Sequence, residues 1–158
     1  MKKLPALAVV IASLPATALA QSGRPQTPPY CFDLSRIVDL AVTKERFESI
    51  AGQPRQGDFR DTSLVLAGWK DCSLYGAASY TCESPEMESA DEAAKAESAV
   101  LRQVKSCLGA GWSEAADRSN PSYVVLRNAA RPVSITLSTD QTDNKKHVVR
   151  LIVFVRRN

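Results

Sequence analysis

The stretch Val133–Thr139, VSITLST, alternates apolar and polar side chains through its first six residues. Successive side chains of a β-strand point to opposite faces, so this pattern predicts a strand in a sheet with one face covered and one face in water. Strand-like runs lie on either side of it, at Tyr123–Asn128 and His147–Arg156. The end of the chain therefore predicts three strands of one sheet.

A helix is predicted directly before these strands, over Ser89–Leu108. Its apolar side chains recur at steps of three and four residues, which is the spacing of an amphipathic helix. Acidic residues fill its first turn and Gly109 follows its last, as is typical of helix ends.

The first half of the chain predicts a similar order of helix and strands. A helical spacing runs from Asp33 to Ala41, and Thr43 is expected to cap a short second helix over Lys44–Ala51. One kinked helix over the same residues fits the pattern equally. The elements expected next are a loop over 52–61, a strand over 63–75 with a possible bulge at Gly68, a turn over 76–78, and a strand over 79–83.

Together these elements predict an α+β fold. We expect a two-layer sandwich in which helices pack on one face of a mostly antiparallel five-stranded sheet, in the order α-ββ-α-βββ. The two halves share only the order of a helix followed by strands, so the sequence shows no internal repeat.

Residues 1–20 have the three zones of a cleavable signal peptide. Lys2 and Lys3 are followed by an apolar run, which ends in the small-residue motif Ala18-Leu19-Ala20. A transmembrane anchor is the alternative, but the run is shorter than the roughly 20 residues that cross a bilayer and lacks a basic flank. We therefore expect a periplasmic or secreted protein without a transmembrane anchor in its mature form.

The residues after the leader divide into an arm and one domain. Residues 21–29, QSGRPQTPP, are rich in proline and small polar side chains, a composition that predicts a flexible arm. Residues 30–158 have a length that normally folds around one hydrophobic core. We expect them to form a single α+β domain.

Four cysteines in an exported domain predict two disulfide bonds. Cys72 and Cys82 are equally far from the centre of the predicted hairpin turn, which favours their pairing and leaves Cys31 for Cys107. Joining Cys82 to Cys107 is the alternative, although a helix that starts after residue 83 would carry Cys107 about two turns past Cys82.

The net charge of the chain does not indicate a particular class of partner. Without the leader the chain has 18 basic and 17 acidic side chains, a formal net charge of +1. The charges are segregated, because residues 83–97 are mainly acidic whereas residues 121–158 are mainly basic. We expect no nucleic-acid partner, and a protein or another envelope component is the expected one.

Motifs of catalysis and metal binding are lacking in the sequence. His147 is the sole histidine, and it follows two lysines at a strand entrance, where an exposed and inert side chain is expected. The carboxylate pairs crowd into a predicted helix start, where solvent and the helix dipole account for them, and Asp140–Asn144 is expected to form a hairpin turn rather than a calcium loop. We expect no catalytic residues, no metal and no cofactor.

The segment Thr43–Pro54, TKERFESIAGQP, resembles a helix in the β-lactamase-inhibitor-like modules of bacterial envelope proteins. The resemblance covers twelve residues, and Val42 stands where those modules have Gly-Met before the threonine. It implies nothing about the function of this chain.

Two features of the sequence suggest binding sites. The last strand is apolar on both faces, which predicts an interaction surface for a partner or a second copy, formed by Val148, Arg150, Ile152, Phe154 and Arg156. A pocket between helices and sheet is the alternative, near Trp69, Tyr80 and Trp112. The first feature favours a non-enzymatic protein that binds a macromolecule, the second favours a binder of small molecules or lipid fragments, and an enzyme of another type ranks third.

Cleavage of the leader is directly testable. Because the small-residue motif ends at Ala20, the intact mass of the exported protein should correspond to a chain that begins at Gln21. Intact-mass spectrometry of the exported fraction checks this. A mature form that retains Met1 in the membrane fraction would contradict it.

Overall fold

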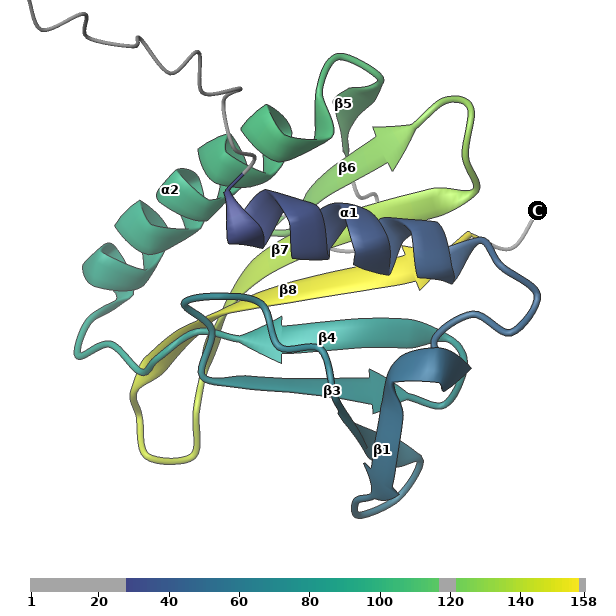
Figure 1. Ribbon diagram of the computed structural model, residues 1–158. Helices are drawn as coiled ribbons and strands as arrows, with labels where there is room; N and C mark the ends of the chain where they lie inside the picture. The colour runs from purple at the N-terminus through teal and green to yellow at the C-terminus, as the bar shows by residue number, and fades with distance from the viewer. Residues whose placement is uncertain (1–27, 117–121, 157–158) are drawn as a thin grey trace, which may run out of the picture.

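The computed structural model describes residues 28–116 and 122–156, which form two helices against one antiparallel sheet (Figure 1). The expected leader and all but the last two residues of the expected arm lie outside these residues. The elements, in chain order, are α1 (Pro29–Ala41), a short 3-10 turn (Glu48–Ile50), β1 (Ala51–Pro54), β2 (Phe59–Thr62), β3 (Asp71–Tyr75), β4 (Ser79–Glu83), α2 (Ala90–Leu108), β5 (Trp112–Ala116), β6 (Val124–Asn128), β7 (Val133–Gln141) and β8 (His147–Val155).

The chain folds as two halves of the same topology, each a helix followed by four strands. The order in the sheet is β1-β2-β3-β4-β8-β7-β6-β5, so the last strand of each half pairs with the last strand of the other at the centre. The sequence analysis found only a shared order of helix and strands in the two halves, and the structure has this order with four strands in each half. The repeat is one of topology, which residue identities do not reveal.

The sheet has eight strands rather than the predicted five. The three missed strands are β1 and β2, which lie in the segment interpreted as a loop, and β5, which begins at Trp112. Their sequences, AGQP, FRDT and WSEAA, do not alternate apolar and polar side chains, so no two-residue period marks them. The α+β class and the packing of helices on a mostly antiparallel sheet are confirmed.

Two further predicted elements are wrong. No second α-helix forms over Lys44–Ala51, because the Thr43 hydroxyl donates to the carbonyl of Leu40 at 2.9 Å and so closes α1 instead of capping a new helix. The helix that carried the resemblance at Thr43–Pro54 is therefore absent. The strand expected over 63–75 is confined to β3, because Gly68 turns the chain with a φ of 88°.

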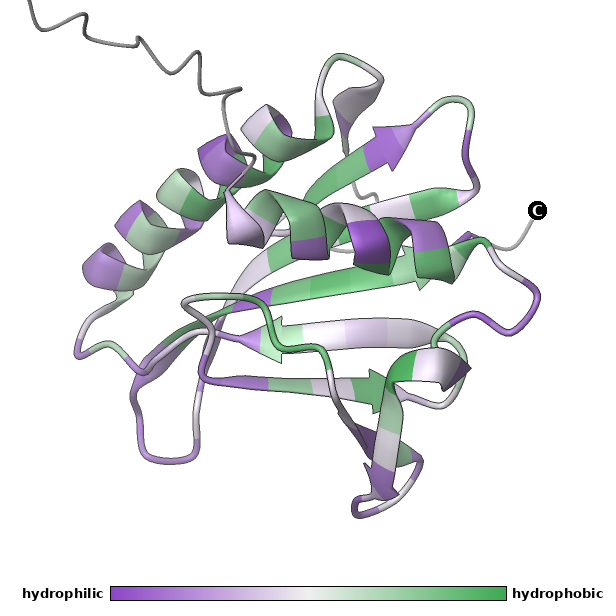
Figure 2. Ribbon diagram, viewed as in Figure 1, coloured by the Kyte–Doolittle hydropathy of each residue, from purple (hydrophilic) through white to green (hydrophobic). Residues whose placement is uncertain are grey.

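Both helices cover the same face of the sheet, and the hydrophobic core lies between the helices and the sheet. Figure 2 shows β8 as hydrophobic along most of its length, and Val149, Leu151 and Val153 on this strand are fully buried. From the helices, Leu34, Ile37 and Val104 are equally buried against them. Burial of this apolar surface is what holds the helices on the sheet.

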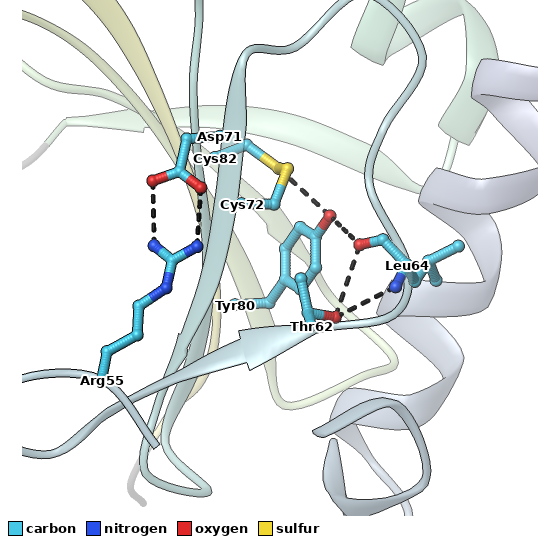
Figure 3. The surroundings of a disulfide bond; sticks show 7 residues. All are labelled: Arg55, Thr62, Leu64, Asp71, Cys72, Tyr80 and Cys82. Atoms are coloured by element: carbon cyan, nitrogen blue, oxygen red, sulfur yellow. Dashed lines mark hydrogen bonds and ion pairs between the residues drawn. A yellow bond between two sulfur atoms is a disulfide. The ribbon is translucent and has the colours of Figure 1, made fainter. Parts of the chain in front are cut away.

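Two disulfide bonds link Cys31 to Cys107 and Cys72 to Cys82, the pairs that the sequence spacing favours. The first joins the start of α1 to the end of α2. The second joins residues directly opposite each other on β3 and β4 (Figure 3). Such bonds persist in oxidising compartments, so they fit a protein exported from the cytosol.

Removal of the two disulfides should destabilise the fold unequally. The bonds close loops with sequence separations of 76 and 10 residues. The chain-entropy relation gives about 4.5 kcal/mol for the longer loop and about 2.7 kcal/mol for the shorter. We expect Cys31→Ser/Cys107→Ser to lose more unfolding free energy in urea than Cys72→Ser/Cys82→Ser. An equal loss, or the reverse order, would contradict this account.

Candidate functional site

The face of the sheet that the helices leave open carries the candidate site. Strand pairing places side chains from neighbouring strands in rows across this face. One row begins with Phe59 on β2 and Tyr75 on β3, continues through Ser79 on β4 and reaches Phe154 on β8. Small hydroxyl side chains thus lie between larger apolar ones.

These small side chains form the floor of a depression of about 530 Å³. Its floor residues are Ser73, Ser79 and Thr81, and its wall on the side of β8 includes Ile152. The opposite wall is an aromatic pair, Phe59 and Tyr75, whose ring centroids lie 5.1 Å apart. The depression exists because the floor residues are short and their neighbours are not.

Charged side chains border the depression in two groups, and Arg55 holds the first. Its guanidinium donates two hydrogen bonds of 2.9 Å to the carboxylate of Asp71 and one of 2.5 Å to Asp61 (Figure 3 shows the pair with Asp71). Bidentate geometry fixes the arginine plane more firmly than a single contact does. Arg55 therefore closes one edge of the depression.

Arg150 on β8 holds the second group. It donates to Glu83 on β4 at 2.8 and 3.1 Å, and its other terminal nitrogen lies 3.2 Å from Asp140 on β7. The carboxylates of Glu83 and Asp71 come from directly paired residues. Like charges at opposite positions repel each other. The ion pairs of Asp71 with Arg55 and of Glu83 with Arg150 offset this repulsion.

The contacts within the two groups shift the pKa values of Asp71, Arg55 and Arg150. The hydrogen bonds from Arg55 lower the pKa of the Asp71 carboxyl below its usual value, against the opposing effect of partial burial. The same hydrogen bonds, with those to Asp61, raise the pKa of Arg55. Burial alone would lower the pKa of Arg150, but the hydrogen bond to Glu83 and the charge of Asp140 raise it. The border is thus a fixed set of charges.

The five residues expected to form an interaction surface do not all lie in the same environment. Arg150, Ile152 and Phe154 lie on the open face and are half-buried. Val148 is buried, and Arg156 donates to the carbonyls of Asn128 and Arg131, so it braces a turn. Three of the five predicted residues therefore lie partly exposed on the open face.

The serines and threonine of β7 correct a second expectation. Ser134, Thr136 and Ser138 were expected to face water, but all three are buried. Ser134 lies opposite Phe154 on one side and Arg127 on the other, so larger side chains shield it. The β7 part of this face is therefore closed to solvent, whereas Ser79, which also lies between two large residues, Tyr75 and Phe154, is only half-buried.

The expected pocket residues belong to the hydrophobic core. Tyr80 is fully buried, its hydroxyl donates to the carbonyl of Leu64 at 2.8 Å, and the phenol oxygen lies 3.1 Å from Sγ of Cys82 (Figure 3). Trp112 is buried and Trp69 packs against the same core. None of the three lines the depression or the shallower hollow beside it, which residues 55–59 and Tyr75 form.

Sequence reasoning missed Arg55, Phe59 and Tyr75, which define one end of the site. Two of them lie in or beside the unrecognised strands β1 and β2. Phe59 and Tyr75 are 42% and 45% exposed, which is unusual for aromatic rings. The sequence offered one signal: Phe59 follows Arg55 by four positions in a segment otherwise rich in glycine and polar residues.

Comparison of the chain with protein-family models, curated proteins and solved structures found no match. Within residues 28–116 and 122–156, no three histidine, cysteine or acidic side chains are grouped so as to hold a metal ion. His147 lies in the half-buried start of β8, where its backbone pairs with Met87. Neither helix of the described chain is long and apolar enough to span a membrane.

Two substitutions on β8 test whether the open face is separate from the core. Ile152→Ser/Phe154→Ser removes half-buried side chains, so we expect a loss of about 1 to 3 kcal/mol and a cooperative transition only a few degrees lower. Val153→Ser is the matched control, because Val153 is fully buried on the opposite face and should cost about 3 kcal/mol or more by itself. Thermal unfolding followed by circular dichroism measures both. If the double variant unfolds as readily as the control, the open face is part of the core.

Proposed function

We propose that this chain is a non-enzymatic, exported binding module that binds a protein through the open face of its sheet. One observation carries the proposal: two exposed aromatic rings and two arginines surround a depression on the face without helices. Tyrosine, phenylalanine and arginine are enriched at the centres of protein interfaces. Large exposed apolar side chains that cluster are typical of interaction sites.

The composition of the depression favours a protein over a small molecule. Small-molecule sites are usually enclosed and mostly apolar, with a few convergent polar groups. Here the floor is hydroxylic, and the charged border is already paired within the chain. Such a surface offers shape and fixed charge over a wide area, which suits the side chains of a second protein.

The proposal also agrees with how rigidly the face is held. The depression spans β2, β3, β4 and β8, and the Cys72–Cys82 bond ties two of these strands together beneath it. A preformed surface loses little conformational entropy on binding. The fold thus supports recognition without rearrangement.

A photoreactive phenylalanine analogue tests the proposal. Placed at Tyr75 in the producing cells, it should form a covalent adduct with one discrete protein on irradiation. The matched control carries the analogue at Ser98, which is exposed on α2 on the other side of the sheet. Combining the Tyr75 analogue with Thr81→Arg, which fills the floor, should abolish the adduct. Equal adducts from both positions, or an adduct from Ser98 alone, would refute the proposal.

A further inference from the structure

The open face places a ridge beside a groove. The ridge is formed by Arg150, Ile152 and Phe154 on β8. The groove is floored by Ser79 and Thr81 on the neighbouring strand β4. Strand pairing places Phe154 directly beside Ser79, Ile152 beside Thr81, and Arg150 beside Glu83. Each large residue of the ridge therefore has a short or oppositely charged neighbour in the groove.

The two halves of the open face also differ in the sign of their charge. In the half formed by β1 to β4, Arg55 is outnumbered by Asp61, Asp71 and Glu83. In the half formed by β5 to β8, the described strand residues of this face are Arg127 and Arg150 against Asp140. Counted over strand residues alone, the formal charges are −3 and +1, and Arg55, which follows β1, reduces the first to −2. The two halves thus attract each other if they meet face to face.

We infer that the partner of the open face is a second copy of this chain. This inference rests on the proposed function and names the partner. A twofold axis between β4 and β8, parallel to the strands, would turn one open face onto another. Each strand then lies over the matching strand of the opposite half, so that β4 faces β8 and the acidic half faces the basic half. Homodimers are usually built on such self-complementary contacts.

The central contacts follow from the registers within the sheet. Because rotation about this axis preserves position along the strands, Phe154 lies over Ser79 of the other copy and Ile152 lies over Thr81. Arg150 lies over Glu83 of the other copy, where its guanidinium faces a carboxylate. Ridge enters groove twice, once in each direction, since every contact of a twofold interface occurs in duplicate.

Contacts further from the axis are weaker, but they also favour association of the two copies. β2 faces β6, which brings the exposed ring of Phe59 toward Arg127 of the other copy, a pairing that favours a cation over an aromatic face. Packed sheets cross at about 30°, so the match is closest at the axis and loosens outward. The dimer is therefore held mainly by β4 and β8.

Charge reversal with mixing tests the inference. Sedimentation velocity up to about 200 µM should show the wild-type chain as a dimer, and Arg150→Glu or Glu83→Arg alone should raise the dissociation constant on the order of tenfold or more. An equimolar mixture of the two variants should restore the dimer, because each then meets the opposite charge across the axis. The pair inside each chain stays broken in both variants, so restoration reports contacts between chains.

A second pair of variants tests shape without altering charge. Thr81→Phe fills the groove, and Ile152→Ala lowers the ridge. Each should weaken the dimer alone, whereas the mixture should restore it because the new ring meets the shortened side chain. Ser98→Arg on α2 is the control and should leave the dimer intact. These variants keep the inference testable if a charge-reversed chain does not fold.

Other results separate this inference from the proposed function. A wild-type chain that stays monomeric throughout this range, or a dimer that both mixtures fail to restore, would overturn the inference. If the Tyr75 adduct nevertheless contains a different protein, the binding function stands and only its partner is wrong. An adduct of twice the mass of the chain, lost with Thr81→Phe, supports both. The lack of any Tyr75 adduct together with a monomer would reject both.

Discussion

The antiparallel pairing of β4 with β8 is the interaction on which the rest of the structure depends. It is the only strand pairing between the two halves in the described chain, and it places Leu151 and Val153 against Cys82 and Tyr80 at the centre of the core. Its other face carries the ridge and the groove. One row of backbone hydrogen bonds therefore fixes both the core and the candidate binding surface.

The sequence was informative wherever a period ran long enough to be recognised. The α2 helix has nineteen residues and β7 and β8 have nine each, and all three follow the predicted pattern. The short strands β1, β2 and β5 read AGQP, FRDT and WSEAA, which do not alternate apolar and polar side chains, so they were missed. Thr43 was misjudged because its hydroxyl can serve the end of one helix or the start of another, and tertiary packing decides between them.

The candidate site could be predicted only on the strand with two apolar faces. Arg150 and Ile152 were found because β8 is long, whereas Arg55 and Phe59 belong to the short strands of the other half. The order of the strands decides which residues are neighbours across a sheet. Here the last strand, β8, lies at the centre beside the fourth strand, β4. No local pattern contains this information, since it depends on residues about 70 positions apart.

The dependence of β4 on β8 also governs how the chain folds. Until its last residues have emerged, β4 has one edge without a partner and Tyr80 lacks the strand that covers it. Unpaired edges of this kind invite association with other chains. A chain that lacks β8 therefore presents an unpaired edge of β4, which can associate with other chains.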